Sequence, residues 1–363
     1  MKANNSTQTN VALLGASLLF CGGVFLALDY LLSTPVVRLM EQEKPYVSKD
    51  GGWYELKRSF VGKDAWGTAI YDVTTDEFGF RVGSRKPGRG DIIILGDSFV
   101  YGINGSSNET FVGLFDASTP KKVLNAGVPS YSPTAYLHSY TTALADSALN
   151  DKHTVVVALD IGDVQDEATR WREGTDHPVL LPTSGPPTSG PNYWGDRLHL
   201  TTRIYRHFRY TLLSPNPFDK GRSAFTWEDW KVLDSKPYYL EGYAPLGVRG
   251  GLDRVANKMR KLAALAREHQ ASFFVLIYPW PAQIKHPDKF SWESYVAALC
   301  RDVQCSGVIN TLPVFRAYAA KNRDWFHELY FQGDVHFNAR GNEIIFRELK
   351  AALDGVKQAE GPE

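Results

Sequence analysis

The chain has 363 residues, and its 40 basic side chains balance 40 acidic ones. This balance argues against a nucleic-acid-binding protein, which usually shows a basic excess or stripe. With 43% hydrophobic, 13% aromatic and 22% charged residues, the composition excludes a disordered or fibrous chain and predicts a globular protein with a sizeable core.

An uncharged segment near the N-terminus is the first predicted element. From Val11 to Leu28 there are 18 residues without a charged side chain, which is long enough to cross a hydrocarbon layer of about 30 Å. A cleaved signal peptide is the alternative, but the run is longer than a usual signal-peptide core and no small-x-small cleavage site follows it. We therefore expect residues 1–32 to form a cytoplasmic tail and a single membrane anchor, with the rest of the chain on the periplasmic side of the cell membrane.

Residues 33–90 predict a juxtamembrane stalk that leads into short strands, punctuated by glycines. Beyond them, short apolar runs alternate with helical patterns. The predicted strands are 91–95, 123–125, 154–159, 273–278 and 308–310, and the predicted helices are 109–117, 133–148, 250–269, 291–301 and 339–354. Strands that alternate with helices predict an α/β domain with a mostly parallel sheet, which we place at residues 91–355, followed by a tail at 356–363.

Residues 170–245 interrupt this alternation as a predicted insertion. The segment contains a proline-rich stretch, a basic and aromatic run and a tryptophan-rich part. An insertion of this size after a strand usually caps or shapes a binding site. Four arginines recur in it at helical spacing, which favours a solvated helix face over a polyanion site: Arg197, Arg203, Arg206 and Arg209.

The three cysteines are too few for a disulfide-scaffolded fold or a four-cysteine zinc site. Cys300 and Cys305 are close enough in sequence to pair in an oxidising compartment, and two free thiols are the alternative. We expect neither a metal nor another cofactor.

A serine directly after the first buried strand is the sharpest chemical signal. Gly96, Asp97 and Ser98 follow the apolar run 91–95. At the carboxyl end of a parallel strand, the hydroxyl of Ser98 can point into the crevice where open α/β sheets bind ligands. The amide that follows the strand can donate to a developing oxyanion.

Such a serine needs a base and a group that orients the base. Asp334 stands two positions before His336, in a loop that precedes the last predicted helix. Asp334 can hold the imidazole in one tautomer while His336 accepts the serine proton. The alternative is structural, with Asp334 bonded to loop amides and His336 packed beneath the helix.

Taken in order, four motifs resemble those of the SGNH/GDSL hydrolase superfamily: GDSFVYG, VLNAGVPSYSP, a Gly-Asp after the third strand, and DVHFNARGN. The resemblance covers about residues 75–355 without the insertion, and it includes bacterial membrane-associated members. It implies a flavodoxin-like three-layer α/β/α sandwich and ester chemistry on lipids or carbohydrates. By position it makes Ser98 the nucleophile, His336 the base and Asp334 its orienting partner. It makes Asp97, Asn125 and Asp163 supporting residues.

The chain departs from the family pattern at three places. Ser130 stands where the second motif usually has a glycine that lines the oxyanion hole, and Gly162 stands where the third usually has an asparagine. Loss of one oxyanion donor costs about 10²- to 10³-fold in rate. Asp334 precedes His336 by two residues instead of three, a spacing that resembles the alginate O-acetyltransferase branch. The amides of Ser98, Ser130 and Gly162 are the oxyanion donors that we expect.

These motifs predict a membrane-anchored, extracytoplasmic serine esterase or O-acyltransferase that acts on O-acyl groups, acetyl above all, of an envelope glycan or another small ester. A multi-span acyl donor protein is the expected partner if the protein is a transferase. The alternatives are a catalytically weak or inactive glycan-binding scaffold, which the missing asparagine favours, and a thioesterase, which would need an apolar acyl channel. Nucleic acid is not an expected partner.

Overall fold

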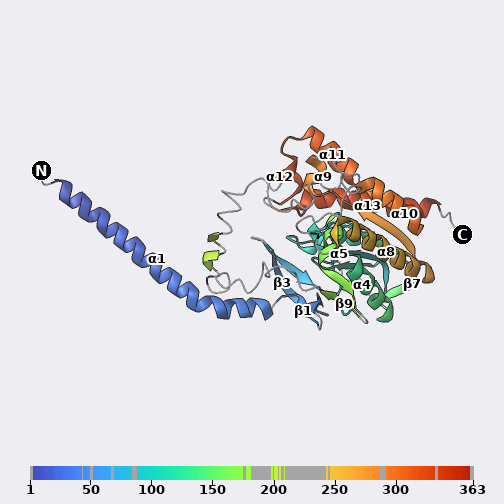
Figure 1. The fold of residues 1–363 in the computed structure, drawn as a ribbon, viewed down its shortest axis with the longest axis horizontal. Helices are drawn as coiled ribbons and strands as arrows, with labels where there is room; N and C mark the ends of the chain where they lie inside the picture. Colours follow the sequence, from blue (N-terminus) through green and yellow to red (C-terminus); the bar gives the residue numbers. More distant parts are fainter. Residues whose placement is uncertain are drawn as a thin grey trace. The chain divides into compact units, whose positions relative to one another are not determined.

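The computed structural model describes residues 3–42, 44–49, 52–66, 69–83, 88–174, 177–180, 198, 200–202, 204–205, 208, 243, 246–285, 292–331 and 334–359. They belong to two compact units, which are described separately here (Figure 1). One unit comprises residues 1–44 and 184–214, and the other comprises residues 45–183 and 215–363. Most of the predicted insertion at 170–245, including the four arginines, lies outside the described residues.

A five-stranded parallel sheet forms the centre of the second unit (Figure 1). The strands occur in the order β11–β10–β7–β5–β6, which is the flavodoxin-like order 2-1-3-4-5 read from the other edge. Their bounds are β5 (Gly90–Gly96), β6 (Val123–Gly127), β7 (Leu149–Ala158), β10 (Ser272–Ile277) and β11 (Gly307–Asn310). The apolar runs of β5, β6, β7 and β10 are buried on both faces, as expected for parallel strands that helices cover, while the edge strand β11 buries only Ile309.

Two groups of helices pack against the sheet. One group contains α4 (Pro133–Ala145), α5 (Gly162–Thr169), α8 (Gly247–Glu268) and α10 (Trp292–Val303), and the other contains α3 (Phe111–Ser118) and α13 (Ala339–Ala359). Right-handed crossovers explain this division. The chain moves from β5 to one edge of the sheet and from β7 to the opposite edge, so the connections fall on opposite faces. The predicted α/β class with three layers is confirmed.

Every strand and helix predicted from the alternation in this domain is present, with ends that differ by a few residues. Several short elements were not predicted, because three to ten residues carry too little periodicity to be recognised. They are α2 (Ser98–Tyr101), the 3-10 helix η2 (Ser107–Glu109), α5, α9 (Pro281–Lys285), α11 (Leu312–Lys321), α12 (Trp325–Leu329), β8 (Trp171–Glu173) and β9 (Pro178–Leu180).

The lead-in segment contains two antiparallel strand pairs, as the predicted short strands require. β1 (Tyr46–Ser48) pairs with β2 (Tyr54–Leu56), and β3 (Val61–Trp66) pairs with β4 (Ala69–Thr74). Arg81, just after them, is 2% exposed and donates its backbone N–H to the carbonyl of Asn125 in β6. The lead-in strands thus belong to the same compact unit as the sheet.

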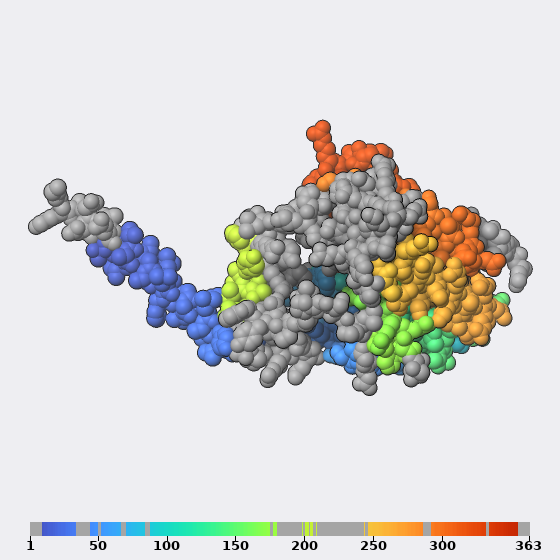
Figure 2. All heavy atoms as spheres, in the orientation of Figure 1, coloured from blue at the N-terminus to red at the C-terminus, as the bar shows by residue number. Residues whose placement is uncertain are grey.

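The first unit is built on one long helix, α1 (Ala3–Gln42). Its segment Thr9–Ser33 is long and apolar enough to cross a membrane (Figure 1), and its apolar side chains are exposed (Figure 2). A signal sequence has the same length and composition, so the anchor stays a prediction. Near the end of this segment, the carboxylate of Asp29 accepts hydrogen bonds from the backbone N–H groups of Leu200 (3.0 Å) and Thr201 (2.7 Å). These bonds tie residues 200–201 of the insertion to α1.

Cys300 and Cys305 are joined by a disulfide between the end of α10 and the loop before β11. Of the two possibilities that the sequence left open, the structure forms the pair. Cys21, on α1, is a free thiol.

Candidate active site

The turn after β5 presents Ser98 at the carboxyl edge of the sheet. Asp97 caps α2 by accepting a hydrogen bond from the backbone N–H of Phe99 at 2.9 Å, so α2 begins at Ser98. A Cβ at Gly96 would lie 2.1 Å from Cγ2 of Val100, and therefore only glycine lets the helix turn back this closely onto the strand. Ser98 is half-buried and its hydroxyl faces the loop of His336.

The end of the neighbouring strand β6 supports this turn. Asn125 is buried; its side-chain amide donates to the carbonyl of Val100 at 2.9 Å and accepts from the N–H of Gly127 at 3.0 Å. A Cβ at Gly127 would lie 2.2 Å from the backbone nitrogen of Tyr101. The structure thus places Asn125 where it holds the end of α2 against β6.

Ser98, His336 and Asp334 form one hydrogen-bonded chain. The Oγ of Ser98 lies 2.8 Å from Nε2 of His336, and Nδ1 of His336 lies 2.7 Å from Oδ1 of Asp334. His336 is 3% exposed, and its ring packs on Phe99 with 4.6 Å between ring centroids. These partners place Nδ1 against Asp334 and Nε2 against Ser98, so that in a neutral imidazole Nδ1–H donates to Asp334 and Nε2 accepts from Ser98.

Asp334 is held as a carboxylate. Burial alone would raise its pKa, but the nearby His336, the indole N–H of Trp66 and the backbone N–H of Val335 hold the pKa well below its usual range. The second oxygen, Oδ2, accepts from Nε1 of Trp66 at 2.8 Å and from Nδ2 of Asn104 at 3.4 Å. Sequence reasoning did not predict that Trp66 or Asn104 donates to Asp334, because each lies more than 200 positions from Asp334.

The expected oxyanion residues follow three adjacent strands. Ser98 follows β5, Ser130 follows β6 and Gly162 follows β7, and these strands end at the same edge of the sheet. Ser130 has φ +63°, a left-handed conformation that favours glycine, and its carbonyl accepts from the indole N–H of Trp171 at 2.9 Å. All three positions thus lie beyond the carboxyl ends of neighbouring strands.

The surroundings of Gly162 leave no room for the family's asparagine. A Cβ there would lie 2.8 Å from Oδ1 of Asp160 and 3.3 Å from Cζ2 of Trp280. Trp280 is held by a bond of 2.7 Å from its Nε1 to Oδ2 of Asp160. The backbone N–H groups of Asp163 and Gly162 and the indole N–H of Trp280 oppose the rise in the pKa of Asp160 that burial causes.

Three aspartates are buried behind the serine and histidine. Burial raises the pKa of Asp97, Asp160 and Asp163, and the pKa of Asp97 and Asp163 is raised further by the charge of Asp160. Asp160 and Asp163 each accept the other's backbone N–H at 3.0 Å, while Asp163 also accepts from Tyr136 and Asp97 from Tyr278. Within the described ranges, no group of three or more histidine, cysteine or acidic side chains is placed to hold a metal ion.

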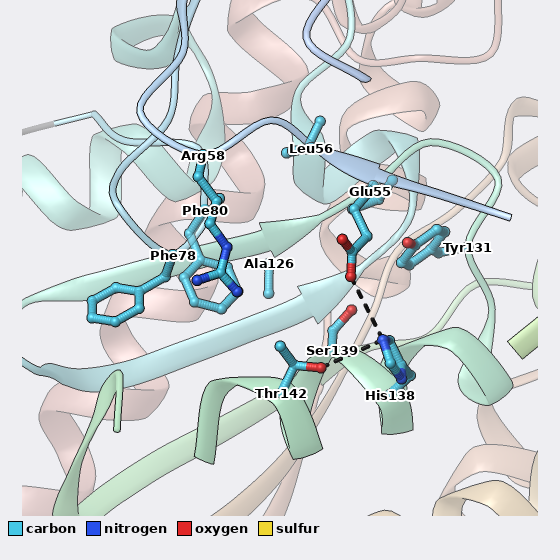
Figure 3. A pocket seen from close by; sticks show the side chains of 12 residues that line it. Glu55, Leu56, Arg58, Phe78, Phe80, Ala126, Tyr131, His138, Ser139 and Thr142 are labelled. Atoms are coloured by element: carbon cyan, nitrogen blue, oxygen red, sulfur yellow. Dashed lines mark hydrogen bonds and ion pairs between the residues drawn. The ribbon is translucent and has the colours of Figure 1, made fainter. Parts of the chain in front are cut away.

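A separate pocket lies between β2 and α4 (Figure 3). On its wall, Oε1 of Glu55 lies 3.7 Å from Nε2 of His138, and Oγ1 of Thr142 lies 3.4 Å from the same nitrogen. Ser98, Asp334 and His336 are not among its lining residues. The pocket therefore takes no part in the hydrogen-bonded chain described above.

Comparison of the sequence with protein-family models and with curated proteins finds no match. Among solved structures, the chain is similar to a protein assigned to the lipolytic G-D-S-L family from Desulfitobacterium hafniense (11% identity, 72% of this chain and 97% of that one, TM-score 0.39). It is also similar to the acetyl xylan esterase AlAXEase (13%, 72% and 98%, TM-score 0.40). A third similar structure is a catalytic mutant of an acetylxylan esterase from Geobacillus stearothermophilus (12%, 73% and 95%, TM-score 0.39). The resemblance to the SGNH/GDSL hydrolases is carried by this chain's own motifs, which meet in the predicted order at the carboxyl edge of a flavodoxin-like sheet.

Proposed function

We propose that the protein is an SGNH-like serine ester hydrolase or O-acyltransferase with Ser98 as its nucleophile. The hydrogen-bonded chain from Ser98 through His336 to Asp334 carries the proposal. A serine hydroxyl is a weak nucleophile by itself, and an adjacent imidazole that is oriented by a carboxylate is what activates it.

In the first half-reaction, Oγ of Ser98 attacks the acyl carbonyl while Nε2 of His336 accepts the hydroxyl proton. The tetrahedral intermediate collapses when the ester C–O bond breaks, and His336 returns the proton to the leaving alkoxide. The acyl group is then bonded to Ser98. In the second half-reaction, His336 activates water for hydrolysis or a sugar hydroxyl for transfer, and Ser98 is released.

The oxyanion would be bound by the backbone amides of Ser98, Ser130 and Gly162. The side-chain donor that an asparagine at position 162 would supply is absent. Loss of one such donor costs about 10²- to 10³-fold in rate. We therefore expect slower turnover than in relatives that keep the asparagine.

We further propose that the substrate is an acetyl ester on an envelope glycan and that the active site faces the periplasm. Three observations support this setting: the apolar segment Thr9–Ser33, the Cys300–Cys305 disulfide and the Asp-x-His spacing of Asp334 and His336. Disulfides persist in oxidising compartments such as the periplasm. If the protein is a transferase, a multi-span membrane protein would supply the acyl group.

A glycan-binding scaffold without catalysis is the second candidate. The observation that favours it is the packing of Trp280 beside Gly162, which fills the place of an oxyanion donor. The preserved contact between Ser98 and His336 opposes it, because a scaffold has no need for an activated serine.

The experiment that separates the two uses the full chain in detergent micelles. We would follow p-nitrophenyl acetate hydrolysis and fluorophosphonate labelling for wild type, Ser98→Ala and His336→Ala, with Ser48→Ala, an exposed serine on β1, as the control. The proposal expects turnover and labelling that both variants lose and the control keeps. Labelling without turnover would favour a transferase that lacks its acceptor. Folded wild-type protein with neither signal would favour the scaffold.

A further inference from the structure

We propose that Trp66, on the lead-in strand β3, is a positioning residue that acts through Asp334. The inference rests on the proposed function and extends the catalytic chain by one member, to Trp66–Asp334–His336–Ser98. It also gives the predicted lead-in strands a role in the reaction.

The contacts of Trp66 reach two members of the chain at once. Its Nε1–H donates to Oδ2 of Asp334 at 2.8 Å, while the other oxygen, Oδ1, accepts from His336. The ring of Trp66 also stands edge-on to the ring of His336, with 5.8 Å between centroids and 81° between planes. A carboxylate held at both oxygens cannot rotate away from the imidazole, and the indole edge limits the tilt of that ring.

The strand that carries Trp66 is also bonded to the nucleophile helix. Asp64 and Trp66 are two positions apart in β3, so their side chains leave the same face of the strand. The buried Asp64 accepts from the hydroxyl of Tyr101 at 2.9 Å, and Tyr101 is the last residue of the short helix that begins at Ser98. One face of β3 therefore contacts both the helix of the nucleophile and the loop of the acid.

Two further tyrosines keep Asp64 in place. The hydroxyl of Tyr46, on β1, donates to it at 2.8 Å, and that of Tyr71, on β4, donates at 3.1 Å. These bonds connect the two lead-in strand pairs through one carboxylate. The position of Trp66 is thus set by a hydrogen-bonded cluster and not by a single contact.

The buried Arg81 connects β4 to the loop that follows α2. Its guanidinium donates to the carbonyls of Gly102 (2.8 Å) and Gly105 (2.6 Å) in the loop after α2, and to the carbonyl of Asp72 (3.2 Å) on β4. That loop contains Asn104, the other donor to Oδ2 of Asp334. Because Asn104 donates over 3.4 Å, Trp66 supplies the shorter of the two bonds.

The test compares Trp66→Phe with Trp53→Phe in the full chain in detergent. Both changes keep an aromatic ring and remove an indole N–H, but Nε1 of Trp53 is buried and has no hydrogen-bond partner among the described residues. A hydrogen bond to a charged group is worth about 10- to 100-fold in an equilibrium or rate. We expect Trp66→Phe to lower kcat for p-nitrophenyl acetate by about this factor with little change in KM, and Trp53→Phe to leave kcat unchanged.

A double-mutant cycle shows whether Trp66 acts through Asp334. In an Asp334→Asn background, Trp66→Phe should change kcat by less than about 2-fold, because the carboxylate that it orients is gone. If Trp66→Phe lowers kcat by about 10-fold in both backgrounds, the inference is overturned and Trp66 has a merely structural role. A Trp66→Phe enzyme with the wild-type kcat would also overturn the inference.

The result with wild type separates this inference from the proposed function. Wild-type turnover that depends on Ser98, together with an unaffected Trp66→Phe, would overturn only the role of Trp66. A folded wild type without Ser98-dependent turnover or labelling would overturn the proposed function and the catalytic role of Trp66 with it. The same cycle measured on melting temperature would then report whether Trp66 and Asp334 interact at all.

Discussion

The Oγ of Ser98 lies 2.8 Å from Nε2 of His336, although 238 positions separate the two residues in the sequence. Ser98 follows β5 near the middle of the sheet, and His336 precedes α13, the helix that packs against α3. The contact forms because the strands are parallel and their carboxyl ends share one edge, to which the chain returns before its last helix. Four predictions concern the residues around this contact.

Replacing Asp334 by asparagine should lower kcat by about 10³- to 10⁴-fold, because the amide no longer selects the Nδ1–H tautomer of His336 or stabilises the imidazolium. Steady-state hydrolysis of p-nitrophenyl acetate would measure the loss. Asp324→Asn is the matched control, since Asp324 also faces a histidine, His327, at 3.9 Å but on the surface. Equal losses in the two variants would contradict the assignment of Asp334.

Restoring the family's asparagine at position 162 should not restore an oxyanion donor. The Cβ of Gly162→Asn would lie 2.8 Å from Oδ1 of Asp160, so the variant must shift Asp160 or Trp280. We expect a lower melting temperature and no gain in kcat/KM. A gain of about 10-fold or more would show that the site has room for the amide, and that our account of this packing is wrong.

Ser130 is expected to tolerate glycine and to reject valine. Its φ of +63° is open to glycine, while a β-branched side chain is strained there. Ser130→Gly should keep the wild-type activity. Its free energy of unfolding should stay within about 1 kcal/mol of wild type, because the relief of strain offsets the greater entropy of the unfolded chain. Ser130→Val should lose about 1–3 kcal/mol in urea unfolding. Equal stabilities of the two variants would contradict the left-handed conformation.

Asp97→Asn should make the protein more stable at pH 8 than the wild type. Burial, and then the charge of Asp160, raises the pKa of Asp97 well above 3.8, so the folded state binds this proton more tightly than the unfolded state does. Protonation of Asp97 therefore stabilises the folded state fully below pH 3.8, and this contribution is lost as the pH rises through the folded-state pKa of Asp97. Asparagine cannot ionise, and its Oδ1 can still accept from Phe99 and Tyr278.

Melting temperatures measured between pH 4 and pH 9 would test this prediction. Each kcal/mol of added stability should raise the melting temperature by about 2–4 °C. The difference in melting temperature between Asp97→Asn and wild type should grow with pH and then level off. Asp151→Asn removes a carboxylate that is 92% exposed, and it should show no such trend. A variant that is less stable than wild type at pH 8 would mean that the Asp97 carboxylate is better compensated than burial alone suggests.

Most of the sheet was predictable from the sequence. Parallel strands buried on both faces are short continuous apolar runs, and the run before Gly96 is one of them. The amphipathic pattern of α8 and the long helix α13 were equally plain. The short helices were not, because a helix such as α5 buries Asp163 and Glu167 where a pattern-based prediction expects apolar residues.

The sequence by itself determined the order of strands and helices, the serine at the end of a strand and the local pairing of Asp334 with His336. These are short-range features, since periodicity, turn chemistry and a spacing of two residues act within a few positions of the chain. The family resemblance already implied that His336 acts on Ser98, but only the tertiary structure decided that Trp66 reaches Asp334 and that Asp97, Asp160 and Asp163 share one buried space. Contacts of this kind join segments far apart in sequence. They form only after the sheet has closed and its two helical layers have packed, and no local pattern encodes them.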